Sequence, residues 1–219
     1  MAQSDQPARA TNRRLVLRGL LATAVLPLIL KFSPLAMAQG TSGAEAFVQS
    51  LGNEALAILK SNATNAAKVD QLKDILARAV NLELVSRLVA GRYWRDMNDA
   101  QQQQFVDLFR QLSIKTMADS LSSYSGQTFK VAGARAADDR DTVVSTLIMQ
   151  PGSAQPSHVD WRVRSLNGQY TIVDIVAEGV SLVVTQRNEV NSIAGSQGVS
   201  GLLAEMQRRL QTNQPLRAG

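Results

Sequence analysis

Gln169-Tyr-Thr-Ile-Val-Asp-Ile-Val-Ala-Glu-Gly-Val-Ser-Leu-Val-Val184 joins a predicted strand to a predicted helix with very little loop between them. Residues 170–176 are rich in β-branched and aromatic side chains, which favour strands. Gly179 interrupts that pattern, and Ser181 is a residue type that commonly caps the N-terminus of a helix. Apolar residues then recur at helical spacing over 182–193. The stretch therefore predicts a sheet strand that passes directly into a helix.

Three more strands are predicted upstream of this junction. A period of two in the apolar residues predicts strands over 128–132, 141–150 and 158–165, in addition to 169–176. Asn167-Gly168 is a strong signal for a hairpin between the last two. In the third strand apolar residues alternate strictly with polar and charged ones, so we expect an antiparallel sheet with one dry face and one wet face.

Helices are predicted before and after these strands. Asn98 and Gln101 have the spacing of a capping box, with Asn in place of Ser or Thr, and open the longest of the helices. Helices followed by antiparallel strands and then by helices indicate an α+β fold. Apolar residues at helical spacing predict helices over about 44–59, 65–80, 84–89, 99–123, 182–194 and 201–211.

The N-terminal segment has the features of an export signal. Arg13 and Arg14 stand just before an apolar run over 19–30, and an A-x-A cleavage site ends at Ala38. The paired arginines favour a twin-arginine signal over a general one. The apolar run has about 12 residues, whereas a spanning helix needs about 20, so a retained membrane anchor is the weaker interpretation. We expect residues 1–38 to be cleaved and the mature protein to be periplasmic.

Charge and cysteine content limit the functions open to the mature chain. Removal of residues 1–38 leaves 18 basic against 17 acidic side chains, so charge gives little support to nucleic-acid binding. The chain has no cysteine, which excludes thiol chemistry, zinc bound by cysteine and acylation of an N-terminal cysteine. We expect residues 39–211 to form one domain held together by its core, with a flexible tail over 212–219.

Catalytic and metal-binding motifs are not evident. The single histidine, His158, lies on the polar face of its predicted strand, and no metal-binding motif occurs. Arg140 interrupts the acidic residues of Asp138-Asp-Arg-Asp141, which favours a solvated loop over a cation site. Asp174 and Glu178 could act as a general base in an apolar pocket. We prefer structural roles for both, because no second base accompanies them.

Three segments carry a resemblance to a known family. They are His158-Val-Asp-Trp-Arg-Val-Arg164, Asp174-Ile-Val-Ala-Glu-Gly-Val-Ser181 and Gln186-Arg-Asn-Glu189. With them the chain resembles the MlaC or toluene-tolerance family of periplasmic phospholipid-binding proteins, over about residues 44–210. A second region of likeness consists of Ala90-Gly91, Trp94, Gln103, Phe105 and Phe109.

The resemblance implies both a fold and a function. It implies a strongly bent antiparallel sheet of the nuclear-transport-factor type, wrapped by helices and enclosing an apolar lipid cavity. It also implies a soluble carrier that maintains outer-membrane lipid asymmetry as the substrate-binding component of an ABC-type lipid transport system. The implied partners are phospholipid as cargo, an inner-membrane ABC lipid transporter complex and an outer-membrane lipoprotein–porin complex. No cofactor and no nucleic acid are expected.

A lipid cargo requires a deep apolar pocket. Each CH₂ group taken out of water contributes about 0.8 kcal/mol, so two acyl chains of ordinary length require roughly 20 kcal/mol or more from the carrier. A small enzyme of the same fold acting on a hydrophobic substrate, and a carrier of another apolar ligand such as a hopanoid or an aromatic solvent, remain as alternatives. We expect the lipid pocket to be lined by Phe105, Phe109, Met117, Leu147, Met149, Val159, Trp161, Val163, Tyr170, Ile172, Val180, Leu182 and Val183.

Overall fold

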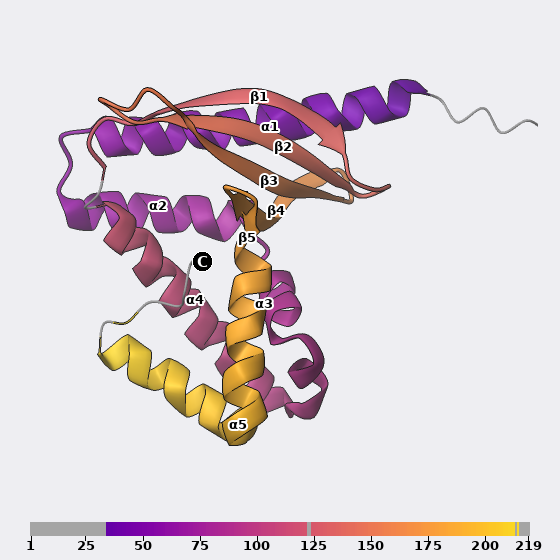
Figure 1. Cartoon of the computed structure of the whole chain (residues 1–219), viewed down its shortest axis with the longest axis vertical. Helices are drawn as coiled ribbons and strands as arrows, with labels where there is room; N and C mark the ends of the chain where they lie inside the picture. Colours follow the sequence, from indigo (N-terminus) through magenta and orange to yellow (C-terminus); the bar gives the residue numbers. More distant parts are fainter. Residues whose placement is uncertain (1–33, 122–123, 213, 215–219) are drawn as a thin grey trace, which may run out of the picture. The chain divides into compact units, whose positions relative to one another are not determined.

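The computed structural model describes residues 34–121, 124–212 and 214 (Figure 1). Most of the predicted signal segment and most of the predicted tail lie outside these residues, so cleavage near Ala38 and the flexible tail stay predictions. Among the described residues, no helix combines the length and the hydropathy that a membrane span needs. In chain order the helices are α1 (Pro34–Lys60), α2 (Asn65–Ala79), α3 (Leu82–Ala90), the 3-10 helix η1 (Gly91–Asp96), α4 (Asp99–Leu121) and α5 (Leu182–Gln211).

The strands form one antiparallel sheet in the order of the sequence, β1-β2-β3-β4-β5. The predicted α+β fold is confirmed, and each of the four predicted strands is present with ends shifted by a few residues. A fifth strand, of two residues, lies where the sequence predicts only a turn. The strands are β1 (Thr128–Ala136), β2 (Asp141–Met149), β3 (Ser157–Leu166), β4 (Gln169–Ala177) and β5 (Val180–Ser181).

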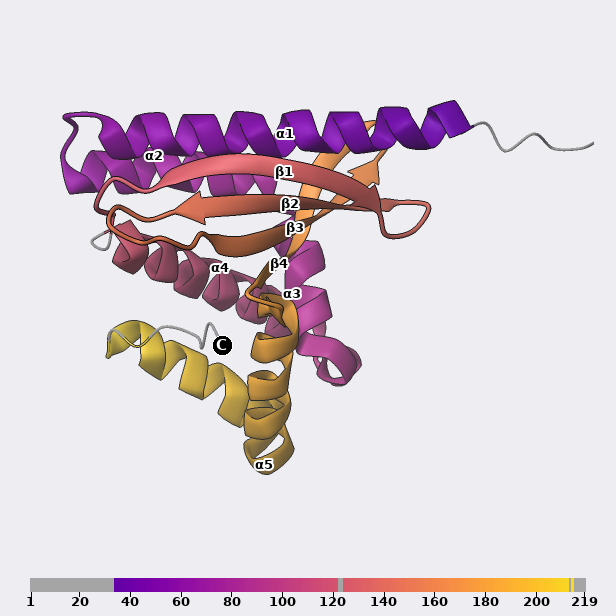
Figure 2. The same cartoon turned by 45° about the horizontal axis from the view of Figure 1, so that its top comes forward.

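The sheet bends strongly, as Figures 1 and 2 show. The pairing of β1 with β2 shifts register between Val131 and Gly133, and that of β3 with β4 shifts between Arg162 and Val163. An extra residue at each shift increases the local twist and bends the strand. The β3–β4 hairpin turns at Asn167-Gly168 with positive φ at both residues, as the sequence predicts.

Helix α1 covers part of the inner face of the bent sheet. Ala44 and Val48 of α1 pack against Val144 of β2 and Val163 of β3, and all four side chains are buried. A Cβ atom at Gly52 would overlap the ring of Phe129, so the helix approaches β1 closely at this point. The sequence predicts this helix from about Ala44, whereas α1 begins at Pro34.

The remaining helices build a second core beside the sheet. Side chains of α3, α4 and α5 meet around Phe105, Leu112 and Leu202, which have no exposed surface. The capping box at the start of α4 is formed as predicted, since Asn98 and Gln101 exchange hydrogen bonds of 3.1 and 2.9 Å.

Helix α5 consists of two segments. Gly198 has φ 69° and ψ 179°, which breaks the helix and turns the second segment back toward α4 (Figure 1). The guanidinium of Arg209 joins the two segments through ion pairs of 2.8 Å to Glu189 and 2.9 Å to Glu205. Hydrogen bonds from Arg208 and Arg209 lower the pKa of Glu205 from 4.5 to about 2. The two predicted C-terminal helices are thus confirmed as segments that meet at Gly198.

Removal of the Glu205 charge tests this ion-pair cluster. Because the pKa of Glu205 is lower in the folded state, its contribution is complete above pH 4.5 and is lost as pH falls toward about 2. We expect Glu205→Gln to cost about 1 kcal/mol near neutral pH, or about 2–4 °C in Tm. The Tm difference from the wild type should shrink between pH 4.5 and 2. Glu83→Gln, which removes an exposed pair on α3, is the control and should change Tm less; an equal loss from both variants would contradict a special role for Glu205.

Candidate functional site

A cavity of about 570 Å³ lies between the inner face of the sheet and the helices, and it reaches the surface. Helices α1, α2 and α4 supply most of the helical wall, and the start of α5 closes one side. Strand β4 supplies the largest share of the sheet wall, next to two residues of β1 and single residues of β2 and β3. Side chains from nine helices and strands therefore converge on one space that they leave unfilled.

The wall of the cavity is almost entirely apolar. Asp174 is the only charged residue on it among the described residues, and the other polar residues on the wall are Ser113, Thr116, Tyr124, Gln127, Thr128 and Gln186. The apolar side chains of the wall are Val48, Leu51, Ala55, Leu56, Leu59, Leu72, Ile75, Leu76, Ala79, Val80, Leu82, Val85, Phe109, Met117, Phe129, Ile148, Trp161, Ile172, Val173, Ile175, Leu182 and Val183.

Two of the four hydroxyl side chains on the described wall are hydrogen-bonded to carbonyl groups of α4. Ser113 donates to the carbonyl oxygen of Phe109 at 2.8 Å, and Thr116 donates to that of Leu112 at 2.9 Å. Such bonds to the preceding helical turn satisfy the hydroxyl without a further partner. These two residues therefore add little polarity to the cavity.

The indole of Trp161 is held by a chain of two hydrogen bonds inside the sheet. Its Nε1–H donates to Thr146 Oγ1 at 2.9 Å, and this hydroxyl donates to the carbonyl oxygen of Val159 at 2.8 Å. Because its polar atom is satisfied there, the ring presents an apolar surface to the cavity.

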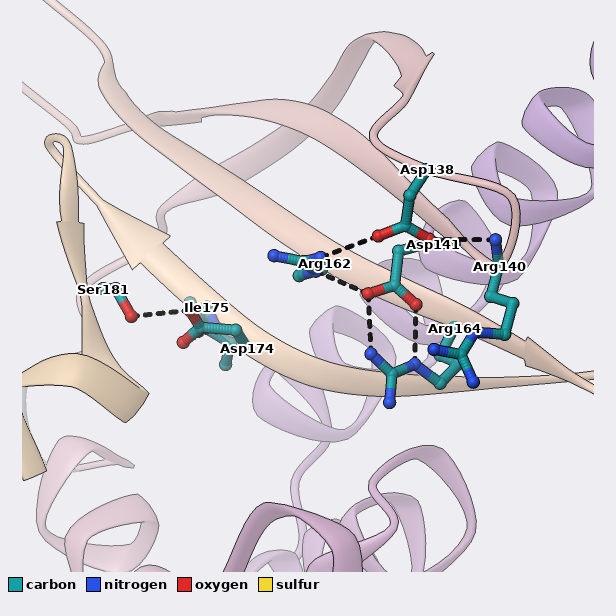
Figure 3. Close-up of polar contacts among 8 residues, drawn as sticks. All are labelled: Asp138, Arg140, Asp141, Arg162, Arg164, Asp174, Ile175 and Ser181. Carbon is teal, nitrogen blue, oxygen red and sulfur yellow. Dashed lines mark hydrogen bonds and ion pairs between the residues drawn. The ribbon is translucent and has the colours of Figure 1, made fainter. Parts of the chain in front are cut away.

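The carboxylate of Asp174 is used to join β4 to α5. Figure 3 shows Asp174 beside Ser181 and Ile175. It accepts hydrogen bonds from the Ser181 hydroxyl at 2.6 Å and from the backbone N–H groups of Ile175 and Val183 at 2.8 and 3.1 Å. Ser181 in turn accepts from the N–H of Val184 at 3.0 Å and caps the helix as predicted.

Glu178 also has a backbone partner. It lies in the β4–β5 turn with φ 48° and accepts a hydrogen bond from the backbone N–H of His158 at 2.7 Å. Asp174 thus holds the strand–helix junction together and Glu178 joins the β4–β5 turn to β3, so both acids have the structural kind of role that we prefer from the sequence. Among the described residues no group of His, Cys, Asp and Glu side chains could hold a metal ion.

Six of the thirteen predicted pocket residues lie on the cavity wall. They come from α4, β3, β4 and α5, and they converge on the same space. These residues are Phe109, Met117, Trp161, Ile172, Leu182 and Val183. Their contact with a lipid stays a prediction.

The other seven are not on the wall, and all but Val159 lie on the outer face of the sheet, near α1, in the helical core or in β5. Leu147 and Met149 lie on the outer face of β2, because Ile148 between them points inward and strand side chains alternate. Val163 and Tyr170 are on the inner face but pack near α1, and Val159 shares that face without reaching the wall. Phe105 is buried in the helical core, and Val180 is half exposed in β5.

None of the predicted pocket residues lies in α1 or α2, although both helices line the cavity. These helices provide about a third of the wall, including Leu51, Ala55 and Leu59 from α1 and Ile75 and Ala79 from α2. The signal was present in the sequence, because both helices have apolar faces that require a covering layer.

The outer face of the sheet carries a network of arginines and carboxylates (Figure 3). Asp141, whose side chain has no exposed surface, forms ion pairs of 2.6 Å with both Arg162 and Arg164. A hydrogen bond from Arg164 lowers the pKa of Asp141, and Arg162 adds to the effect. Asp138 accepts a further bond of 3.0 Å from Arg162. Arg162 and Arg164 of β3 thus neutralise Asp138 and Asp141, whereas the sequence interpretation rested on Arg140 and on a solvated loop.

Neutralising Asp141 tests the importance of this network. Asp141→Asn should destabilise the fold by about 2–3 kcal/mol, because it leaves two arginines without their buried acceptor. The lowered pKa means that the carboxylate contributes fully above its ordinary value of 3.8 and less as pH falls below it. Denaturant unfolding from pH 7 to pH 3 should therefore show the gap between wild type and variant closing at the acidic end.

The neighbouring acid provides a matched control. Asp139 is exposed in the same loop, so Asp139→Asn should change stability by less than about 0.5 kcal/mol. Similar losses from both variants would show that only the net charge of the loop matters.

Comparison with known proteins places this fold in a family. A model of the family described as MlaC protein matches residues 49–208. The chain belongs to the MlaC family. The resemblance seen in the sequence is therefore confirmed.

Two similar proteins show how close the likeness is in sequence and in structure. A phospholipid-binding protein from Ralstonia solanacearum, whose structure was solved in complex with a phospholipid, superposes with a TM-score of 0.69 at 27% identity, covering 78% of this chain and 98% of that one. The intermembrane phospholipid transport system binding protein MlaC of Haemophilus influenzae is 26% identical over 132 residues, or 59% of this chain. The alignment spans 62% of the length of that relative.

Proposed function

We propose that this protein is a soluble periplasmic carrier that binds a phospholipid by its acyl chains. The observation that carries the proposal is the cavity of about 570 Å³ with its almost uncharged wall. Hydrocarbon chains gain about 0.8 kcal/mol per CH₂ in such a space, whereas a charged ligand would lose its hydration without finding an opposite charge. The phospholipid in the related Ralstonia solanacearum structure supports the same cargo.

Asp174, the single charged residue on the described part of the wall, does not weaken this choice of cargo. The carboxylate of Asp174 is occupied by three donors of the strand–helix junction, so it offers little to a cationic ligand. The phosphate-bearing headgroup of the lipid would then remain near the mouth of the cavity, in water. Weak discrimination between headgroups follows from that placement.

The proposed place of the carrier is between two membranes. We assign it the role of substrate-binding component of an ABC-type lipid transport system, exchanging phospholipid with an inner-membrane transporter complex and an outer-membrane lipoprotein–porin complex. The support is membership of the MlaC family and the name of the Haemophilus influenzae relative, which is an intermembrane phospholipid transport system binding protein. Export through the predicted signal would bring the protein to that compartment.

Lipid extraction and a cavity-filling variant test the function together. Protein purified from cells without detergent should release phospholipid that mass spectrometry identifies. Ala55 lies on the cavity wall, whereas Ala57, on the same helix, is exposed. Ala55→Trp should place an indole in the space for acyl chains and reduce bound phospholipid severalfold, while Ala57→Trp should leave it unchanged.

Folding of both variants can be checked by their thermal unfolding. A hopanoid or an aromatic compound in place of phospholipid would identify a carrier of another ligand. Unchanged lipid content in a folded Ala55→Trp protein would show that the cargo does not occupy this cavity.

A further inference from the structure

One polar side chain on the cavity wall is both deeply buried and without a partner. Gln186, in the second turn of α5, has 8% of its surface exposed and lines the cavity. Its amide makes no hydrogen bond to any residue in the described part of the chain. Buried amides are nearly always hydrogen-bonded, so an unpaired one on an apolar wall calls for an explanation.

The position of Gln186 makes its polarity more unusual. Along α5, the buried residues Val183, Gln186, Val190 and Ala194 form one face directed at the helical core. An apolar residue would be expected at every position of such a face. Gln186 therefore interrupts the apolar pattern of this face, and its side chain borders the cavity, a space that another molecule can enter.

A second unpaired group on the wall is less suited to bind cargo. The hydroxyl oxygen of Tyr124 is completely buried and has no hydrogen-bond partner among the described residues. Because it is sealed from the cavity by other atoms, a ligand could reach it only if the wall moved. The Gln186 amide keeps some exposed surface, so it is the better candidate.

We propose that the Gln186 amide donates hydrogen bonds to the ester carbonyl oxygens of the bound phospholipid. This inference rests on the function proposed above. An acyl chain has no hydrogen-bonding group except its ester, whose carbonyl oxygen is an acceptor. The amide NH₂ of glutamine supplies two donors and no charge. Gln186 would thus fix how far the chains enter the cavity and would favour ester-linked lipids over ether-linked ones.

A competition between two lipids tests this inference. Vesicles would contain equal amounts of dioleoyl phosphatidylethanolamine and its dialkyl ether analogue with the same chain length and headgroup. After incubation and repurification, mass spectrometry gives the ratio of the two lipids bound to the protein. If Gln186 forms one hydrogen bond with the ester lipid that the ether lipid cannot form, the wild type should bind the ester lipid in about 3- to 10-fold excess.

Gln186→Met, which keeps the length of the side chain, should bring this ratio close to one. The same variant without lipid should melt at the same or a higher temperature than the wild type, because it removes an unpaired amide from an apolar wall. Gln104→Met changes an exposed glutamine of α4 and should keep the preference of the wild type. Gln186→Leu serves as a second variant if Gln186→Met is poorly folded.

The outcomes separate the two proposals. Binding of both lipids by the wild type without preference would overturn the role of Gln186 and leave the carrier function intact. A preference that survives in Gln186→Met and Gln186→Leu would also overturn it. Failure of the wild type to bind either lipid would overturn the carrier function, and this inference with it.

Discussion

The inner face of the bent sheet carries more apolar surface than the helix lying along it can cover. Val144 and Val163 are buried beneath α1, whereas Ile148, Trp161 and Ile172 border the cavity, although Trp161 and Ile172 also pack against side chains of α1 and α2. In an ordinary domain the adjacent helices would move in until this surface was close-packed. Here α2 contacts β4 at Ile172, but α2, α4 and the start of α5 leave an apolar cavity beside the sheet that the described side chains do not fill.

The polar groups around that interior are arranged so that few of them face it. Ser113 and Thr116 bond to carbonyl groups of their own helix, and Trp161 bonds within the sheet. Asp174 is turned to the β4–α5 junction, where its three hydrogen bonds fix the entry of α5. The wall can therefore be apolar even though it is built from segments that also contain hydroxyl groups and a carboxylate. Gln186 is an exception, because its amide lines the cavity without a hydrogen-bond partner among the described residues, and we therefore propose a function for it.

The sequence contains enough information to predict the strands and most of the helices. Asn167-Gly168 and Ser181 are local signals whose geometry depends on a few neighbouring residues, and the structure shows both as expected. The inward face of β2 was harder to predict. Leu147 and Ile148 are both apolar, so composition gives no choice between the two faces, and the pairing with β1 and β3 decides it.

The cavity wall depends on relations that are not local. Whether an apolar side chain on the inner face reaches the cavity depends on where α1 lies: Val163 is buried beneath α1, whereas Trp161 packs against the same cluster and also reaches the cavity. Gln186 could be recognised in the sequence as part of a family-like segment, but not as an unpaired amide. That observation requires knowledge of all its neighbours in space.

The backbone conformation of Gly198 determines whether the C-terminal segment of α5 can pack against the helical core. If Gly198 had ordinary helical angles, α5 would run straight on, and Leu202, Leu203 and Met206 would project into water instead of closing the core beneath α4. A side chain at this φ would be strained, so replacement of this residue would weaken packing of a whole helical segment whose own sequence is unchanged.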